Sequence, residues 1–260
     1  WYTLQIALVR CLWALLPAAL LWGASFPLAL AAAASEEADT GRLVGGIYAA
    51  NTGGAILGAL SASLILIPAI GTGPSQSVLI ALCALSGLLM LVPLLRPFRL
   101  PNALAVGAAA GAAVLLVSSV APVPGMLIAY GRRMMTSMAR SKVLYTGEGI
   151  NSSIAITEWD DGAIQFHVSG KVEASTESYD MRLQRMLGHL PALVHKNPKS
   201  VLIVGFGAGV TAGSFVVYPE IQRIVICEME PLIPPIATRY FGKQNYFVVN
   251  DPRTQVIYDD

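Results

Sequence analysis

The stretch HLPALVHKNPKSVLIVGFGAGVTAGSFVVYPEIQRIVICE, from His189 to Glu228, decides the fold of the second half of the chain. It predicts a buried strand over 201–204, a glycine-rich turn, a helix, and a second strand over 224–227 that ends in an acid. Parallel strands joined in this order form a nucleotide- or nucleoside-binding crevice at their carboxyl ends. The stretch therefore predicts an α/β, Rossmann-like domain.

The glycine turn, from Gly205 through Gly207 to Gly209, is the first candidate binding element. Glycines let the backbone bend sharply and approach a ligand, and the amino end of the next helix directs free N–H groups at it. Val210 stands where a dinucleotide fingerprint has its third glycine, so the spacing favours folds that bind S-adenosylmethionine. A strand-to-helix turn without a ligand has the same pattern, and that alternative remains open.

Acidic residues follow the next two predicted strands. Glu228 ends the strand over 224–227, where a carboxylate can accept both hydroxyls of a ribose. The strand over 254–258 ends in Asp259 and Asp260, where an acid can accept a hydrogen bond from an adenine amino group. Either acid alone could be a surface residue at a strand end. Three suitable positions at three successive strand ends predict a nucleoside pocket.

The region before the Rossmann-like domain is expected to be rich in β-structure, over residues 143–178. Alternating apolar residues on both sides of Asp160-Asp161-Gly162 predict a hairpin over 154–168. Residues 179–195 have helical spacing, and Asn197-Pro198 ends that helix. We expect residues 179–260 to form the first half of the Rossmann-like domain.

The first half of the chain is apolar. Residues 1–130 hold only seven of the 33 charged side chains. Four segments are long and apolar enough to cross a hydrocarbon core, which takes about 20 residues. These segments are 11–34, 43–67, 76–95 and 103–121. We therefore expect an α-helical transmembrane bundle over residues 1–122 and a linker over 123–142.

Few polar groups lie in the middle of the predicted spans, so we expect these helices to anchor the protein rather than to form a transport path. The pairs Gly54 and Gly58, and Gly107 and Gly111, have the spacing that lets two helices pack closely in lipid. Positive charges near the spans place the soluble half in the cytoplasm, because five lie on its side and three on the other. Those five are Arg10, Arg132, Arg133, Arg140 and Lys142.

Composition excludes several classes of function. The net charge of +1 does not indicate nucleic-acid binding. Cys11, Cys83 and Cys227 are scattered through apolar runs, so we expect neither a disulfide framework nor a metal site. The chain begins at Trp1 and stops just after a predicted strand, and we expect it to be a fragment cut at both ends.

The soluble half resembles the spermidine synthases, which are polyamine aminopropyltransferases, and in particular the bacterial form in which several membrane spans precede the synthase domain. The soluble stretches that carry the resemblance are Val168-Ser-Gly-Lys-Val-Glu-Ala-Ser175, Asp180-Met-Arg-Leu-Gln-Arg-Met-Leu-Gly-His-Leu-Pro191, residues 197–213, Cys227-Glu228 and Asp251-Pro-Arg253. In the membrane half, Gly23-Ala-Ser-Phe-Pro27 and Gly45-Gly-Ile-Tyr-Ala-Ala-Asn-Thr-Gly53 are similar to the spans of those fused proteins.

The resemblance implies transfer of an aminopropyl group from decarboxylated S-adenosylmethionine, as co-substrate, to putrescine or a similar amine, with no tightly bound cofactor. It implies a multi-pass protein of the bacterial inner membrane, with polyamine and the lipid bilayer as partners and a possible homo-oligomer. By position, the donor and nucleoside site would consist of Gly205, Gly207, Gly209, Glu228, Asp260, Gln184 and His189, the last two lining the aminopropyl side. His189 could instead pack the helix, and Gln184 could be solvated.

Three positions depart from the family pattern. Ala208 replaces an acid of the glycine loop, Leu183 replaces an aromatic residue, and Glu173 stands at an expected glutamine. The catalytic residue is unknown, because the expected aspartate lies beyond residue 260; we expect this fragment to be inactive by itself. Two alternatives remain open: an S-adenosylmethionine-dependent methyltransferase on the same fold, and a non-catalytic polyamine-binding or transport membrane protein.

Overall fold

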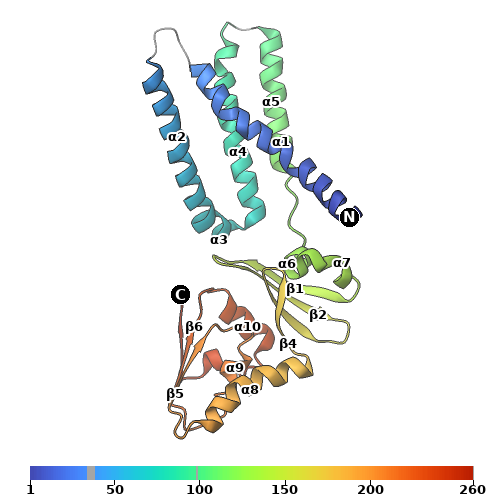
Figure 1. Cartoon of the computed structure of the whole chain (residues 1–260), viewed down its shortest axis with the longest axis vertical. Coiled ribbons are helices and arrows are strands. Elements are labelled where there is room, and N and C mark those ends of the chain that lie inside the picture. The colour runs from blue at the N-terminus through green and yellow to red at the C-terminus, as the bar shows by residue number, and fades with distance from the viewer. Residues whose placement is uncertain (34–38, 98, 260) are drawn as a thin grey trace. The chain divides into compact units, whose positions relative to one another are not determined.

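The computed structural model describes residues 1–33, 39–97 and 99–259. The chain divides into two compact units, Trp1–Ser61 and Ala62–Asp260, and each is described by itself. Figure 1 shows the order of the helices and strands along the chain.

The first unit consists of two long apolar helices, α1 (Tyr2–Ala33) and α2 (Thr40–Ser61). They contact each other through an edge-to-face pair of Phe26 and Tyr48, whose ring centroids lie 6.2 Å apart. The side chains of Trp13 and Trp22 are 84% and 82% exposed. Apolar side chains that surround a helix without being covered are typical of a helix that meets lipid.

The second unit begins with a π-helical turn, η1 (Ala62–Leu66), and a short helix, α3 (Ile67–Ile70). Two long apolar helices follow, α4 (Thr72–Leu91) and α5 (Leu100–Ser118), joined through η2 (Val92–Leu95). These two helices pack against each other.

Four stretches are long and apolar enough to cross a membrane: Leu4–Ala33, Gly41–Ile70, Thr72–Leu91 and Leu100–Ser118. Each overlaps one of the spans expected from the sequence and begins earlier than expected. The division at residue 122 between membrane region and linker remains a prediction. A Cβ atom added to Gly54, Gly58, Gly107 or Gly111 would meet nothing within 4 Å. The prediction that these glycines mediate close helix packing is therefore wrong for contacts within either unit.

The expected linker over 123–142 contains helical structure: α6 (Gly125–Tyr130), η3 (Gly131–Arg133) and α7 (Met134–Ser137). Ala129 and Tyr130 are buried together with Ala155 of the following sheet. This packing explains why the segment is ordered rather than an extended linker.

An antiparallel sheet follows, with strands in the order β1 (Ser141–Glu148), β2 (Ser153–Trp159), β3 (Ile164–Val168) and β4 (Lys171–Ser175). Ile156 of β2 stands opposite Phe166 of β3, which confirms the predicted hairpin. Its turn contains Gly162 at φ +83°, a conformation that favours glycine.

The α/β part contains α8 (Ser178–Val194), β5 (Ser200–Val204), α9 (Val210–Gly213), β6 (Arg223–Cys227), α10 (Ile233–Phe241), η4 (Val248–Asn250) and β7 (Thr254–Ile257). Its three strands are parallel, as predicted from the sequence, and they lie in the order β5-β6-β7. The predicted helix after the glycine turn is present as α9, which ends after four residues and is followed by turns.

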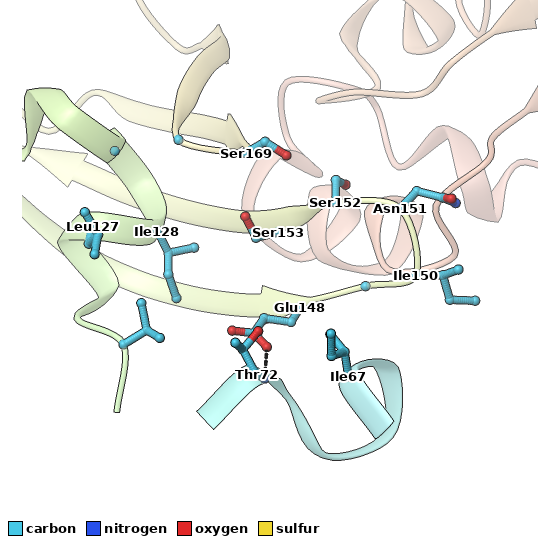
Figure 2. A pocket seen from close by; sticks show the side chains of 14 residues that line it. Ile67, Thr72, Leu127, Ile128, Glu148, Ile150, Asn151, Ser152, Ser153 and Ser169 are labelled. Atoms are coloured by element: carbon cyan, nitrogen blue, oxygen red, sulfur yellow. Dashed lines mark hydrogen bonds between the residues drawn. The ribbon is translucent and has the colours of Figure 1, made fainter. Parts of the chain in front are cut away.

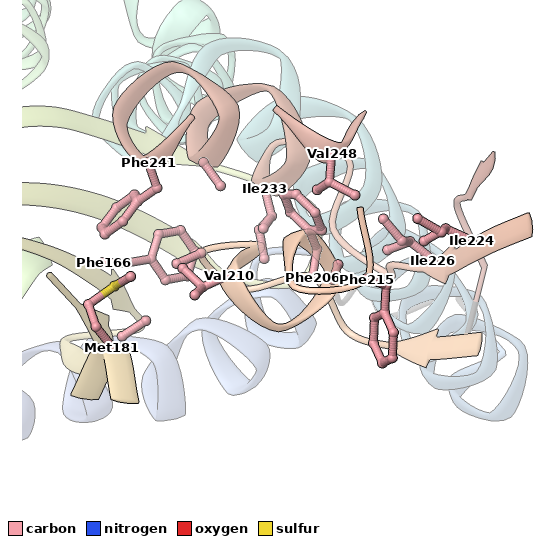
Figure 3. Close-up of a cluster of buried hydrophobic side chains, with 14 of the residues drawn as sticks. Phe166, Met181, Phe206, Val210, Phe215, Ile224, Ile226, Ile233, Phe241 and Val248 are labelled. Atoms are coloured by element: carbon pink, nitrogen blue, oxygen red, sulfur yellow. The ribbon is translucent and has the colours of Figure 1, made fainter. Parts of the chain in front are cut away.

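One hydrophobic core joins the antiparallel sheet to the α/β part (Figure 3). Phe166 of β3 and Phe241 of α10 are both fully buried, and their rings meet edge to face with centroids 6.4 Å apart. Aromatic side chains in a shared core hold the two sheets in a fixed relation, because loss of either ring would leave a cavity.

Candidate functional site

The glycine turn lies between β5 and α9. Gly205, Gly207 and Gly209 have φ values of +80°, +54° and +77°, a region in which residues with a side chain are strained. Around Gly205 and Gly207 a Cβ atom would meet nothing within 4 Å, whereas at Gly209 it would overlap the ring of Phe206. The first two glycines therefore present open backbone to a ligand, and the third is packed.

Glu228 lies directly after β6, beside this turn. Its side chain is buried, at 6% exposure for the residue. Oε2 accepts a hydrogen bond of 2.6 Å from the backbone N–H of Phe206, and Oε1 accepts one of 2.9 Å from the N–H of Glu230. A carboxylate has about four acceptor positions, so two remain for hydroxyl groups of a ligand. The structure thus places the predicted acid next to the predicted loop.

The third strand ends at the same edge of the sheet. The backbone N–H of Glu228 donates a 2.9 Å hydrogen bond to the carbonyl of Ile257, the last residue of β7. Asp260, the predicted adenine-binding acid, lies outside the described residues.

Asn245 supports the glycine turn from beneath and was missed by the sequence interpretation. It is fully buried; its Nδ2 donates a 3.0 Å hydrogen bond to the carbonyl of Ala208, and its Oδ1 accepts one of 3.0 Å from the N–H of Phe247. A Cβ atom at Gly213 would overlap the backbone of Asn245. No local pattern marks its contact with the glycine turn, because Ala208 lies 37 residues away in the sequence.

Gln184 lies on α8 close to the glycine turn. Its carbonyl accepts a 2.9 Å hydrogen bond from Oγ1 of Thr211, and its side-chain Nε2 donates one of 3.2 Å to the carbonyl of Ser175 at the end of β4. Gly188 brings α8 close to the segment after the turn, since a Cβ atom there would lie 2.7 Å from Cβ of Ser214. Gln184 is therefore a half-buried residue at the junction of β4, α8 and α9.

His189 has a different environment. Its Nδ1 lies 2.9 Å from the hydroxyl of Tyr218, and the two rings are 5.7 Å apart. The residue also lines a pocket of about 590 Å³ together with Arg182, Arg185 and Gln244, and no residue of the glycine turn lines that pocket. These contacts favour the packing alternative, and the role of His189 in the aminopropyl site remains a prediction.

Glu230 is a second buried acid near this edge, at 3% exposure, and the sequence interpretation did not single it out. Its Oε2 accepts a 2.9 Å hydrogen bond from the backbone N–H of Asn151, whose side-chain amide donates to the carbonyl of Met229 at 3.1 Å. Gly149 passes so close that a Cβ atom would overlap the Glu230 carboxylate. Glu230 thus ties the β1–β2 loop to the end of β6. Among the described residues, His, Cys, Asp and Glu form no group of three able to hold a metal ion.

Comparison with known proteins supports the resemblance to spermidine synthases that the sequence indicates. Residues 180–260 match the family model described as the spermine/spermidine synthase domain. A polyamine aminopropyltransferase of Thermotoga petrophila is 31% identical over 127 residues, which cover 49% of this chain and 42% of that protein. The enzyme of the same name from Leptospira biflexa is 30% identical over 122 residues, covering 46% of this chain and 43% of the relative.

Solved structures give matches of similar extent. Spermidine synthase from Thermotoga maritima aligns with a TM-score of 0.43 and 28% identity, covering 46% of this chain and 42% of that one. A spermidine synthase in complex with the transition-state analogue AdoDATO aligns with a TM-score of 0.42 and 29% identity, covering 45% and 40% of the two chains. The chain spans less than half the length of the relatives it matches. The chain is thus similar, over residues 180–260, to the spermine/spermidine synthase domain, and it shares about 30% identity with polyamine aminopropyltransferases over just under half of its length.

Proposed function

We propose that the protein is a membrane-anchored aminopropyltransferase of the spermidine synthase type. It would transfer the aminopropyl group of decarboxylated S-adenosylmethionine to putrescine or a similar amine. The observation that carries this proposal is the open backbone at Gly205 and Gly207 held beside the buried Glu228, within the stretch that matches the family.

The reaction is a displacement at carbon. The amine nitrogen attacks the carbon next to the sulfonium, the carbon–sulfur bond breaks, and methylthioadenosine leaves with the electron pair while the amine loses a proton. Glu228 would accept hydrogen bonds from the ribose hydroxyls, and Asp260 one from the adenine amino group. Gly205 and Gly207 would let the donor approach the backbone, and Gln184 would border the aminopropyl side. Such positioning lowers the barrier because the reacting atoms start in line.

The four apolar helices support the membrane anchor, because their apolar side chains are left largely uncovered within the two units. The basic residues Arg132, Arg133, Arg140 and Lys142 lie between the last of these helices and the second strand, which favours a cytoplasmic synthase domain. The bacterial inner membrane is the location that fits both features.

The test uses the full-length protein in detergent, with putrescine and either decarboxylated or intact S-adenosylmethionine, followed by mass spectrometry. Methylthioadenosine formed together with spermidine is the expected result. S-adenosylhomocysteine instead would identify a methyltransferase, an alternative that rests on Ala208. If neither methylthioadenosine nor S-adenosylhomocysteine forms, this result would contradict an enzymatic role. A binding or transport protein would then be the remaining interpretation.

The role of Glu228 can be tested within the same assay. Glu228→Gln removes the charge, and hydrogen bonds to charged groups contribute roughly 1.5–3 kcal/mol, so KM for the donor should rise about 10- to 100-fold. The matched control is Glu220→Gln, which changes an exposed acid of the same kind and should leave KM unchanged. An unchanged KM in Glu228→Gln, with the fold intact by thermal unfolding, would exclude ribose binding by this residue.

A further inference from the structure

A second cavity, of about 590 Å³, lies away from the glycine turn, and its size is within the range of small-molecule sites. Figure 2 shows it between the start of α4, helix α6 and the loops at one end of the antiparallel sheet. Neither the glycine turn nor Glu228 lines it. Its lining residues are Ile67, Thr72, Val123, Leu127, Ile128, Gly131, Glu148, Gly149, Ile150, Asn151, Ser152, Ser153, Ser169 and Gly170.

Among the described residues that line this cavity, Glu148 is the only one with an ionisable side chain. One of its carboxylate oxygens, Oε2, accepts a hydrogen bond from the backbone N–H of Thr72 at the amino end of α4 (Figure 2). Within the described part of the chain the other oxygen, Oε1, has no hydrogen-bond partner. A helix amino end carries roughly half a positive charge, so the cavity keeps a net negative charge.

The same carboxylate can be reached from a second side. An adjoining cavity of about 320 Å³ is lined by Glu148 together with Gly71, Thr146 and Ile128. The half-buried Glu148 therefore stands between two hollows, where a positively charged group would be only partly desolvated on binding.

The rest of the lining determines the class of ligand. Asn151, Ser152, Ser153 and Ser169 supply amide and hydroxyl oxygens that can accept hydrogen bonds from an ammonium group. Five apolar side chains, those of Ile67, Val123, Leu127, Ile128 and Ile150, supply a surface for methylene groups. None of the described lining residues is basic, which disfavours an anion as ligand. These features together select a cation with an alkyl body.

We infer that this cavity is a binding site for a primary alkylammonium group, with Glu148 as its counter-ion. The group can come from a free diamine or polyamine, or from the ethanolamine headgroup of a phospholipid at the ends of the apolar helices. The inference goes beyond the proposed transfer reaction and does not depend on it.

The test measures equilibrium binding of radiolabelled 1,4-diaminobutane to the full-length protein in phosphatidylcholine nanodiscs. This diamine is putrescine, so the transfer site would bind it as well, as a second component of the binding curve. Glu148→Gln keeps an acceptor for the N–H of Thr72 but removes the charge, so the affinity of one binding component should fall about 10- to 100-fold while the other stays unchanged. The matched control is Glu158→Gln, which changes an acid at the other end of the sheet and should leave binding unchanged. The uncharged 1,4-butanediol should not compete.

Nanodiscs of phosphatidylethanolamine in place of phosphatidylcholine distinguish the free amine from the lipid headgroup as the source of the ammonium group. Weaker binding of the diamine in phosphatidylethanolamine would identify the headgroup as a competing ligand. Equal binding in both lipids would identify the free amine as the ligand. Unchanged binding in Glu148→Gln, or equal competition by butanediol, would overturn the inference.

Turnover separates this site from the transfer site. In Glu148→Gln the Glu148-dependent binding of the diamine should be lost, while the KM for the amine in turnover stays the same. If the binding affinity and the KM change by the same factor, the bound amine is the reacting one, and a separate site is refuted. Glu148-dependent binding in a protein with no turnover would support this inference and contradict the proposed reaction.

Discussion

Acidification should open the antiparallel sheet through one buried residue, His167 of β3. The residue is fully buried, its Nε2 lies 2.8 Å from the hydroxyl of Thr157, and its ring meets that of Tyr130 at 4.6 Å. Burial lowers the pKa of His167 from 6.5 to about 4, and the carbonyl of Ala129 opposes this effect. The folded protein therefore holds a neutral imidazole at pH 5, whereas the unfolded chain holds a charged one.

The size of the effect follows from the two pKa values. Above pH 6.5 both states are neutral and the full stability is present. Between pH 6.5 and about 4 the unfolded state binds a proton that the folded state does not, so stability falls as the pH falls. One pKa unit corresponds to about 1.36 kcal/mol, so the loss approaches roughly 3 kcal/mol, a large share of the 5–15 kcal/mol typical of a domain.

Hydrogen exchange followed by mass spectrometry can localise this loss. Peptides covering 153–168 should lose protection between pH 7 and 4.5, after correction for intrinsic exchange rates. His167→Gln should remove this pH dependence, and His195→Gln, at an exposed histidine, should keep it. Equal protection at both pH values in the wild type, or a pH dependence that persists in His167→Gln, would refute the reasoning.

Three further predictions concern the α/β part. Gly209→Ala should lower the free energy of unfolding by about 2–4 kcal/mol, because the backbone is strained and the new Cβ overlaps the ring of Phe206. Gly205→Ala should lower it by only about 1–2 kcal/mol, because it introduces the backbone strain alone. Urea unfolding measures both losses, and equal losses would contradict the packing argument. Arg253→Lys should lower the free energy of unfolding by about 2–3 kcal/mol, because lysine cannot reproduce the paired hydrogen bonds to Asp251 and those to three main-chain carbonyls. A thermal midpoint equal to that of the wild type would disprove this prediction. Phe241→Ala should lower the free energy of unfolding by about 3–5 kcal/mol, because it removes a fully buried ring that contacts Phe166. A loss of less than about 1 kcal/mol in denaturant unfolding would mean that the two sheets do not share this core.

Much of the antiparallel sheet and of the α/β part could be predicted from the sequence, because the signals are local. The alternation around Gly162 and the apolar run over 201–204 are patterns of neighbouring residues, and the structure contains the corresponding hairpin and strand. The same holds for the position of Glu228 beside the glycine turn, since parallel strands bring their carboxyl ends together.

Other features depend on contacts between distant residues. Asn245 reaches Ala208, and Glu230 reaches Asn151, across long separations in the chain that no periodicity reveals. The shortness of α9 has a local cause instead, because the β-branched and aromatic residues after Gly213 and the proline at 219 disfavour a longer helix.

The close approach of Gly149 to the Glu230 carboxylate has a consequence for how related proteins can diverge. Any side chain at position 149 would overlap that carboxylate, so the two positions cannot vary independently. Homologues with alanine or serine at position 149 should carry a shorter residue, such as aspartate, at position 230. The pair would then leave a covariation signal across the boundary between the antiparallel sheet and the α/β part, marking which synthase-like chains keep this loop in place.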